Sequence, residues 1–141
     1  MHEAEARRRA GRARVARLGS LTPDGRLHLV PICFALDRGT LYTAIDEKPK
    51  RSMRPQRLEN VAAYPDVCVL VDGWDEDWSQ LWWVRFRGRA RILENGAERE
   101  QALTLLRGKY AQYECHELGA VIAVELDELR GWAASTKLAP S

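Results

Sequence analysis

The chain has 141 residues, of which 45% are hydrophobic and 30% are charged. This length and composition are typical of one soluble globular domain, so we expect a single domain over residues 1–141. No apolar run approaches the roughly 20 residues of a membrane-spanning helix, and the N-terminal segment lacks the apolar stretch of a secretory signal peptide. We therefore expect a cytoplasmic protein without a membrane partner. The formal charge of +2 is too small to indicate a nucleic-acid partner.

The N-terminal half of the sequence predicts one helix followed by an antiparallel meander. Residues 3–17 are rich in Ala, Arg and Glu, which favours an N-terminal helix within residues 1–17. The segments VARLGSL, RLHLVPICFAL and TLYTAID are then typical of three strands, with Gly25 and Gly39 in turns that need a positive φ. Because Pro31 cannot donate a hydrogen bond, we expect the second strand to be bulged or to lie at a sheet edge.

The C-terminal half predicts two more helices and three more strands. Asn95 followed by Glu98 is a capping pattern that indicates the start of a helix. The expected elements are a helix over 55–64, strands over 66–72 and 81–93, a helix from Asn95 to Tyr110, and a strand over 119–129. The tail after the last strand is too polar to belong to the core, except for Trp132. Six strands and three helices indicate a mainly β fold, a six-stranded, closed or partly closed antiparallel barrel with peripheral helices.

The strand LWWVRFRGRARIL, residues 81–93, alternates apolar and basic side chains. Successive side chains of a strand point to opposite faces, so one row is apolar and the other cationic. The cationic row consists of Trp83, Arg85, Arg87, Arg89 and Arg91. It is either the solvated face of a half-buried strand or the wall of an anion-binding groove.

A second basic cluster lies in KPKRSMRPQR, residues 48–57. Its members are Lys48, Lys50, Arg51, Arg54 and Arg57, with no acidic residue among them. Because the segment leads into a helix, free backbone amides and guanidinium groups would meet there, which is the composition of a phosphate site. The alternative is a solvated basic turn.

Four of the five tryptophans lie close together in the sequence. Trp82 shares its row with apolar residues and belongs to the core, whereas Trp83 shares the cationic row, where an indole beside guanidinium groups suits a flat anionic ligand. Trp74 and Trp78 in an acidic loop indicate either a lid or a dimer contact. The tail Trp132 is a further candidate.

The sequence contains no motif of a catalytic site built from protein groups alone. GxGxxG, GxxxxGK[ST], HExxH and GxSxG are all absent, the three histidines are scattered, and the three cysteines show no CxxC spacing. If the protein is an enzyme, we expect a bound cofactor to supply the reactivity.

Three segments in order carry a resemblance to a known family. They are GSLTPDGRLHLVPICFALDRGTLYTAID, then KPKR ahead of RLENVAAYPDVCVLVD, then DEDWSQLWWVRFRGRARIL. Over residues 13–135 the chain resembles the pyridoxamine 5'-phosphate oxidase-like split β-barrel proteins. Within them it is most similar to the actinobacterial group of coenzyme F420-dependent enzymes.

The resemblance implies a homodimer with cofactor clefts at the interface that hold a flavin or the deazaflavin F420. Arg57 stands where the family keeps a basic residue for the cofactor phosphate, with Lys48, Lys50 and Arg51 as its neighbours. The strand Val30, Pro31, Ile32, Cys33 and Phe34 corresponds to the one along the cofactor ring. Trp83 and Trp132 match positions near the cleft, and we add Arg85 from the cationic row.

The function that we expect is hydride transfer between F420 and a small unsaturated substrate, since the phosphate and glutamates of the F420 tail suit a long cationic groove better than the single phosphate of FMN does. Tyr42 and Asp72 are candidate proton donors, with solvent as the alternative. The competing hypotheses are an FMN-binding oxidase of the same fold and a non-catalytic carrier of F420 or haem. The longer C-terminal substrate-phosphate motif of a true pyridoxamine phosphate oxidase is not found.

Overall fold

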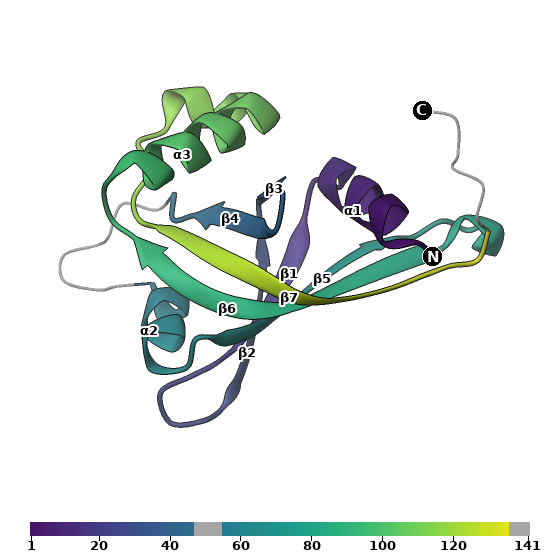
Figure 1. The fold of residues 1–141 in the computed structure, drawn as a ribbon, viewed down its shortest axis with the longest axis horizontal. Coiled ribbons are helices and arrows are strands. Elements are labelled where there is room, and N and C mark those ends of the chain that lie inside the picture. The colour runs from purple at the N-terminus through teal and green to yellow at the C-terminus, as the bar shows by residue number, and fades with distance from the viewer. Residues whose placement is uncertain (47–54, 136–141) are drawn as a thin grey trace.

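The computed structural model describes residues 1–46 and 55–135. In these two ranges the chain forms seven strands, three α-helices and two short 3-10 helices (Figure 1). In chain order they are α1 (Glu3–Arg12), β1 (Ala16–Leu21), β2 (Leu27–Ile32), β3 (Ala35–Asp37), β4 (Thr40–Ala44), α2 (Gln56–Ala63), β5 (Asp66–Gly73), η1 (Trp78–Gln80), β6 (Trp82–Leu93), α3 (Ala97–Lys109), η2 (Ala111–Cys115) and β7 (Val121–Ala133).

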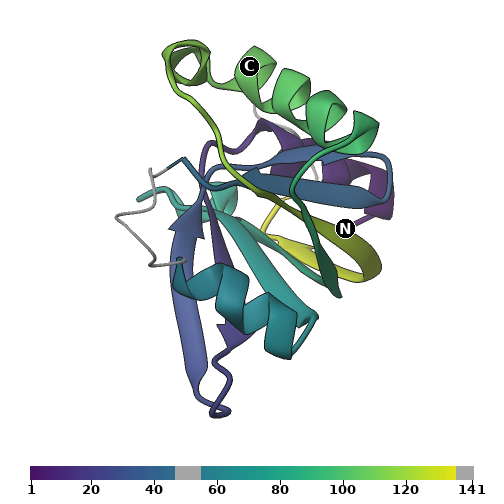
Figure 2. The ribbon, with the colours of Figure 1, turned by 90° about the vertical axis from the view of Figure 1, so that its left-hand side faces the viewer.

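All seven strands belong to one antiparallel sheet in the order β2-β1-β5-β6-β7-β4-β3. Strands β2 and β3 follow each other in the chain but form the two ends of this order, so the sheet must curl to bring its ends together (Figures 1 and 2). The result is a half-barrel. The expected count of six strands was wrong, because the second predicted strand is two strands.

The break between β2 and β3 has a specific cause at Cys33 and Phe34. The hydroxyl of Tyr110 accepts a hydrogen bond from the Phe34 amide at 3.1 Å, and it lies 3.2 Å from the Phe34 carbonyl and 3.0 Å from the Arg14 carbonyl, to which it can donate. A side chain from the end of α3 therefore takes over the backbone groups that would have continued the ladder. As expected from Pro31, β2 is an edge strand.

The larger hydrophobic cluster fills the inside of the curl. Inward-pointing residues of the strands, among them Leu18, Phe86 and Val84, are fully buried there. Helix α1 contributes Ala6 and Ala10, and helix α2 contributes buried residues to the same cluster. The side of the sheet that faces this cluster is called the inner face.

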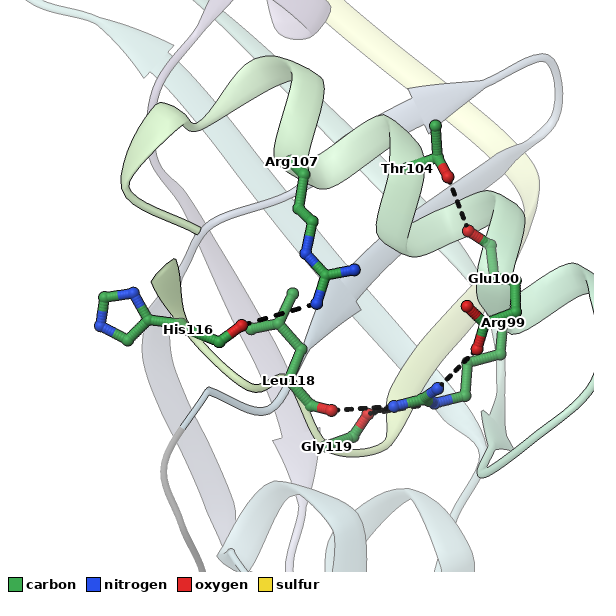
Figure 3. Close-up of polar contacts among 7 residues, drawn as sticks. All are labelled: Arg99, Glu100, Thr104, Arg107, His116, Leu118 and Gly119. Carbon is green, nitrogen blue, oxygen red and sulfur yellow. Dashed lines mark hydrogen bonds and ion pairs between the residues drawn. The ribbon is translucent and has the colours of Figure 1, made fainter. Parts of the chain in front are cut away.

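A smaller cluster lies between α3 and the strands β3, β4 and β7. Tyr42 and Ala44 of β4 pack there against Leu103 and Leu106 of α3. Figure 3 shows how α3 is fixed to the loop before β7: the Arg99 guanidinium donates to the carbonyl oxygens of Leu118 and Gly119, at 2.8 and 2.9 Å. Helix α3 thus covers only one part of the face opposite the inner face.

Several predicted boundaries were wrong. The N-terminal helix ends at Arg12 and not at residue 17, because Ala16 already points into the core as part of β1. The last strand runs on to Ala133, since the polar tail pairs with the start of β6. Helix α3 is preceded by Gly96 with φ 98° and has no side-chain cap.

Of the two turns, Gly25 has φ 85° as expected. In the second turn, however, Arg38 takes the positive φ of 55° in place of Gly39. In the described part of the chain, no helix is long and apolar enough to cross a membrane.

Candidate functional site

Strand β6 shows the alternation that its sequence predicts. Val84 and Phe86 are fully buried and Ala90 is nearly so, whereas Arg87 and Arg89 are exposed. The side of the sheet that carries Trp83, Arg85, Arg87 and Arg89 is called the outer face. The outer face of β2, β1, β5 and the first part of β6 carries neither of the two described hydrophobic clusters.

A hollow of about 420 Å³ lies on the outer face at the start of β6. It is called the tryptophan hollow, and its lining residues are Leu70, Asp72, Gly73, Trp74, Leu81, Trp82, Trp83, Arg85 and Trp132. Strand pairing explains the grouping, because Trp83 stands opposite Asp72 on one side and Trp132 on the other, and Arg85 stands opposite Leu70. The expectation that Trp83, Arg85 and Trp132 gather in one place agrees with this geometry.

Arg85 is the unusual group of the tryptophan hollow. Its Cζ lies 5.7 Å from the centroid of the Trp83 ring, and its Nε is buried without a hydrogen-bond partner. A buried N–H of a cation without an acceptor is costly, by about 1–3 kcal/mol or more. The free N–H of Arg85 therefore suits an acceptor group on a flat ligand that stacks near Trp83.

The two candidate proton donors lie in different places. The Asp72 carboxylate borders the tryptophan hollow and accepts a hydrogen bond from Arg17 Nη1 at 2.9 Å, in a half-exposed ion pair. The Tyr42 side chain is buried beside α3, and its hydroxyl donates to Glu98 Oε2 at 2.9 Å in a partly buried contact. Burial, followed by the contact with Glu98, raises the pKa of Tyr42. Tyr42 is thus not brought to the hollow.

The cationic row is shorter than its sequence predicts. Arg91 lies beyond the exposed stretch and donates to both oxygens of Glu98 at 2.7 Å and to Glu125 Oε1 at 2.6 Å. These contacts lower the pKa of Glu98, the Arg91 hydrogen bond being the main cause. For Arg87 and Arg89 there is no ion pair with a carboxylate in the described ranges. The positive charge that remains available is that of Arg85, Arg87 and Arg89.

A second and larger hollow, of about 630 Å³, lies further along the outer face. It is called the leucine hollow, and its lining residues are Gly19, Ser20, Leu21, Leu27, His28, Leu29, Asp66, Val67, Cys68, Arg87, Gly88 and Asp127. The exposed fractions of Leu27 and Leu29 are 91% and 71%, which is unusual for leucines in regular strands. Sequence reasoning missed this hollow, although alternation in the second strand would have placed Leu27 and Leu29 on one face.

The predicted ring-binding strand does not present one continuous side-chain surface. Ile32 and Phe34 point into the core and are 5% and 0% exposed, whereas Pro31 is exposed. Val30 packs partly against the larger cluster and Cys33 against the smaller one. A ligand along this segment would therefore meet Pro31 and the free backbone of an edge strand.

The second basic cluster is only partly within the described residues. Lys48, Lys50 and Arg51 lie outside them, and Arg57 lies in the first turn of α2 with its Nε buried and unpartnered. Helix α2 packs on the inner face, where Asn60 donates to the buried Ser20 hydroxyl at 3.1 Å. Within one chain, α2 and Arg85 are thus on opposite sides of the sheet and are not brought together.

The sequence pattern of the family described as pyridoxamine 5'-phosphate oxidase matches residues 2–133. The chain belongs to this family. The family binds FMN or related flavins, and the half-barrel of the present chain is its fold. The two unpartnered guanidinium Nε atoms, of Arg57 and Arg85, fit the anionic or acceptor groups of such a cofactor. A comparison with curated proteins found no match.

Solved structures support the same fold across nearly the whole chain. A conserved hypothetical protein of Mycobacterium tuberculosis is 22% identical, with 95% of this chain and 86% of that chain covered and a TM-score of 0.78. A conserved protein of unknown function from Corynebacterium diphtheriae is 22% identical, with 94% of each chain covered and a TM-score of 0.68. A FAD-binding protein of Mesorhizobium loti is 20% identical, with 93% and 94% covered and a TM-score of 0.64. At these identities the likeness shows the fold.

Proposed function

We propose that this protein is an F420-dependent oxidoreductase that works as a homodimer and transfers a hydride to a small unsaturated substrate. The observation that carries the proposal is the buried, unpartnered Nε of Arg85 beside Trp83 in the tryptophan hollow. A guanidinium N–H in this position is satisfied when a ligand brings an acceptor. The neighbouring indole favours a ligand with a flat ring system.

The number of unsatisfied cations favours F420 over FMN. Besides Arg85, the described residues include Arg57 with an unpartnered Nε and the exposed Arg87 and Arg89. FMN carries one phosphate, whereas the F420 tail carries a phosphate and several glutamates. A longer polyanion can meet more of these separated charges, because each guanidinium needs its own acceptor.

The placement of α2 is the reason for proposing a dimer. Arg57 and Arg85 lie on opposite sides of the sheet, so one chain does not direct both at one ligand. Two copies can combine the tryptophan hollow on the outer face of one with the α2 end of the other. A shared cleft of this kind supplies ring contacts and phosphate contacts from different chains.

The roles of the residues follow from their positions. Trp83 and Trp132 would hold the ring system, and Arg85 would donate its free N–H to an acceptor on it. Reduced F420, when bound, supplies the hydride. Because the Asp72 carboxylate already accepts from Arg17 and Tyr42 is engaged with Glu98, we assign the proton to solvent, which enters through the open side of the hollow.

Side-by-side fluorescence titrations with F420 and FMN test the proposal. We expect F420 to bind more tightly than FMN, with an affinity that falls as salt rises. We expect Arg85→Met to weaken F420 binding about tenfold, since about 1.4 kcal/mol is typical of one charge-assisted hydrogen bond. The matched control is Arg26→Met, which removes the same charge from an exposed turn.

The outcomes separate the competing functions. Tighter binding of FMN, with a yellow protein on purification, would establish the FMN-binding alternative, which the family match also allows. Binding of F420 without oxidation of its reduced form by any unsaturated acceptor tested would indicate a carrier. Failure of both cofactors to bind would overturn the proposal.

A further inference from the structure

Arg17 and Asp72 form an ion pair at the border of the tryptophan hollow, and the proposed function gives this pair no role in binding. Arg17 Nη1 donates to Asp72 Oδ1 at 2.9 Å, and both side chains are 42% exposed. An ion pair with this exposure contributes little to the stability of a fold, because water screens the two charges. Stability therefore does not explain why the pair stands beside the hollow.

Strand pairing brings Arg17 and Arg85 into one row across the outer face. Strands β1, β5 and β6 are neighbours in the sheet. Arg17 of β1 stands opposite Leu70 of β5, and Leu70 stands opposite Arg85 of β6. Cross-strand partners point to the same side of a sheet, so the two guanidinium groups flank Leu70 on the outer face. Their Cα atoms are separated by two strand spacings, about 10 Å.

Leu70 provides an apolar floor between the two guanidinium groups. Its side chain is 39% exposed and lines the tryptophan hollow, as Asp72 and Arg85 do. Arg17 is not among the lining residues but is in contact with one of them, Asp72. A flat ring laid on Leu70 thus has Arg85 at one end and the ion pair at the other. The separation of these ends suits three fused six-membered rings.

The ion pair offers both a donor and an acceptor to this end of the ring. A guanidinium group has several N–H donors, and within residues 1–46 and 55–135 only Nη1 of Arg17 has a hydrogen-bond partner. Asp72 accepts through Oδ1, whereas its Oδ2 has no partner in the same two ranges. A hydroxyl is a group that both donates and accepts. The ion pair is therefore matched to a ring that ends in a hydroxyl.

The rings of F420 and FMN differ at one end. F420 carries a hydroxyl where FMN carries methyl groups, and both have two carbonyl groups at the other end. A methyl group placed against the ion pair would displace water without replacing its hydrogen bonds. We propose that Arg17 and Asp72 select the deazaflavin ring by binding its hydroxyl, with Arg17 donating to the oxygen and Asp72 accepting from the O–H. The inference rests on the proposed function, because it takes the tryptophan hollow as the ring site.

The other charged groups of the row lie further from this end of the ring. Beyond Leu70 come Arg85 on β6 and then the exposed Arg130 on β7. On the opposite side, the partner of Arg17 in β2 is Pro31, which carries no charge. Because charge interactions weaken with distance, Arg17 and Asp72 have the largest effect on a hydroxyl bound between them.

Three probes without phosphate or glutamates test the recognition of the ring alone. FO consists of the ring and ribityl chain of F420, 5-deazariboflavin shares the deaza ring but has methyl groups in place of the hydroxyl, and riboflavin has the ring of FMN. Fluorescence titration measures the dissociation constant of each probe. We expect FO to bind at least about tenfold more tightly than 5-deazariboflavin, because a site that binds a hydroxyl rejects an analogue without it. Riboflavin should bind no better than 5-deazariboflavin.

Arg17→Met and Asp72→Asn test the two halves of the ion pair. Each should reduce the preference for FO over 5-deazariboflavin roughly fivefold, and Arg17→Lys, which keeps a charged donor, should retain more of it than Arg17→Met does. The matched controls are Arg26→Met and Asp24→Asn, since these two residues form another exposed ion pair, in the β1–β2 turn. The controls should leave the preference unchanged. Urea unfolding should show that all these variants are about as stable as the wild type.

The absorption spectrum of bound FO reports whether its hydroxyl is ionised, which a purely structural role of the ion pair would not affect. Removal of the negative charge of Asp72 favours the ionised oxygen, so Asp72→Asn should lower the pH at which bound FO ionises. Removal of the positive charge of Arg17 favours the neutral hydroxyl, so Arg17→Met should raise this pH. Unchanged or opposite shifts would show that the hydroxyl lies elsewhere.

The outcomes separate this inference from the proposed function. Equal binding of FO and 5-deazariboflavin, failure of FO to bind, or an unchanged preference in both variants would overturn the inference. If F420 then still binds more tightly than FMN, the proposed function stands and depends on the tail. If FO is preferred but no unsaturated acceptor tested oxidises reduced F420, the hydroxyl site stands and the proposed enzymatic function falls.

Discussion

Replacement of Lys109 by methionine should make the protein more stable at neutral pH, because this lysine is held in an unfavourable place. Its Nζ is buried without a hydrogen-bond partner, 3.8 Å from the centroid of the Phe34 ring. Burial, with a smaller contribution from Arg14, lowers the pKa of Lys109 from 10.5 to about 8. The charged ammonium is therefore less stable in the folded protein than in the unfolded chain.

The magnitude follows from the linkage between pKa and stability. A drop from 10.5 to about 8 corresponds to a ceiling of about 3 kcal/mol of lost stability, at about 1.4 kcal/mol per pKa unit. The side chain is only partly buried, so solvent screening reduces this figure. The cation–π contact with Phe34 stabilises the charged lysine by about 1 kcal/mol, which reduces the penalty further. We expect Lys109→Met to raise the free energy of unfolding by about 1 kcal/mol at pH 7.

The direction in which stability changes with pH follows from which state binds the proton of Lys109. Below about pH 8 the lysine is charged in both states and the full penalty is present. Between about 8 and 10.5 the folded protein has lost the proton that the unfolded chain still binds, so the stability of the wild type rises with pH. The advantage of Lys109→Met should therefore shrink from pH 7 to pH 9.5.

Urea unfolding of the wild type, Lys109→Met and Lys109→Arg at both pH values is the assay. The arginine variant keeps its charge throughout and should gain nothing at pH 9.5 relative to pH 7 through this site. A methionine variant that is less stable than the wild type at pH 7, or an advantage that does not shrink at pH 9.5, would refute the reasoning.

Four further substitutions test the packing of the fold. Gly88→Ala should lower the free energy of unfolding by about 3 kcal/mol, because its Cβ would clash with the fixed carbonyl oxygen of Glu125. Gly108→Ala is the matched control, since a Cβ there would meet nothing within 4 Å, and it should stabilise α3 by about 0.5–1 kcal/mol in the same urea assay. Asn60→Ala should cost about 2–3 kcal/mol in thermal unfolding, because it leaves a cavity and strips the buried Ser20 hydroxyl of its donor. Tyr110→Phe should cost about 1–3 kcal/mol and speed hydrogen exchange at the β2–β3 break, and unchanged exchange there would contradict the role of its hydroxyl.

The alternation along β6 was predictable because it depends only on local geometry. The period of two in residues 81–93 places Val84 and Phe86 inside and the arginines outside, whatever the neighbouring strands are. The same rule separates Trp82 from Trp83 less sharply, because both line the tryptophan hollow and Trp82 is only partly buried against the larger cluster. The family resemblance was also recognisable, since ordered segments spread over most of the chain carried it.

The split of the second strand was not predictable from its own residues. RLHLVPICFAL is apolar on both sides of the break, and the group that takes over the Phe34 amide is Tyr110, far away in the chain. Likewise, no local pattern tells on which face of a sheet a helix packs. Whether Arg57 and the arginines of β6 gather within one chain depends on that choice, and the placement of α2 on the inner face keeps them apart.

The four arginines of β6 are better understood one at a time than as a single charged surface. Neighbouring members are about 7 Å apart, where two like charges in water repel by only about 0.6 kcal/mol, so the row by itself does not demand a ligand. What distinguishes its members is desolvation. Arg91 is satisfied by Glu98 and Glu125 within the chain, Arg87 and Arg89 are exposed to water, and Arg85 alone combines a buried N–H with the lack of an acceptor. Because an unsatisfied buried donor costs more than several exposed repulsions, a ligand gains most at Arg85.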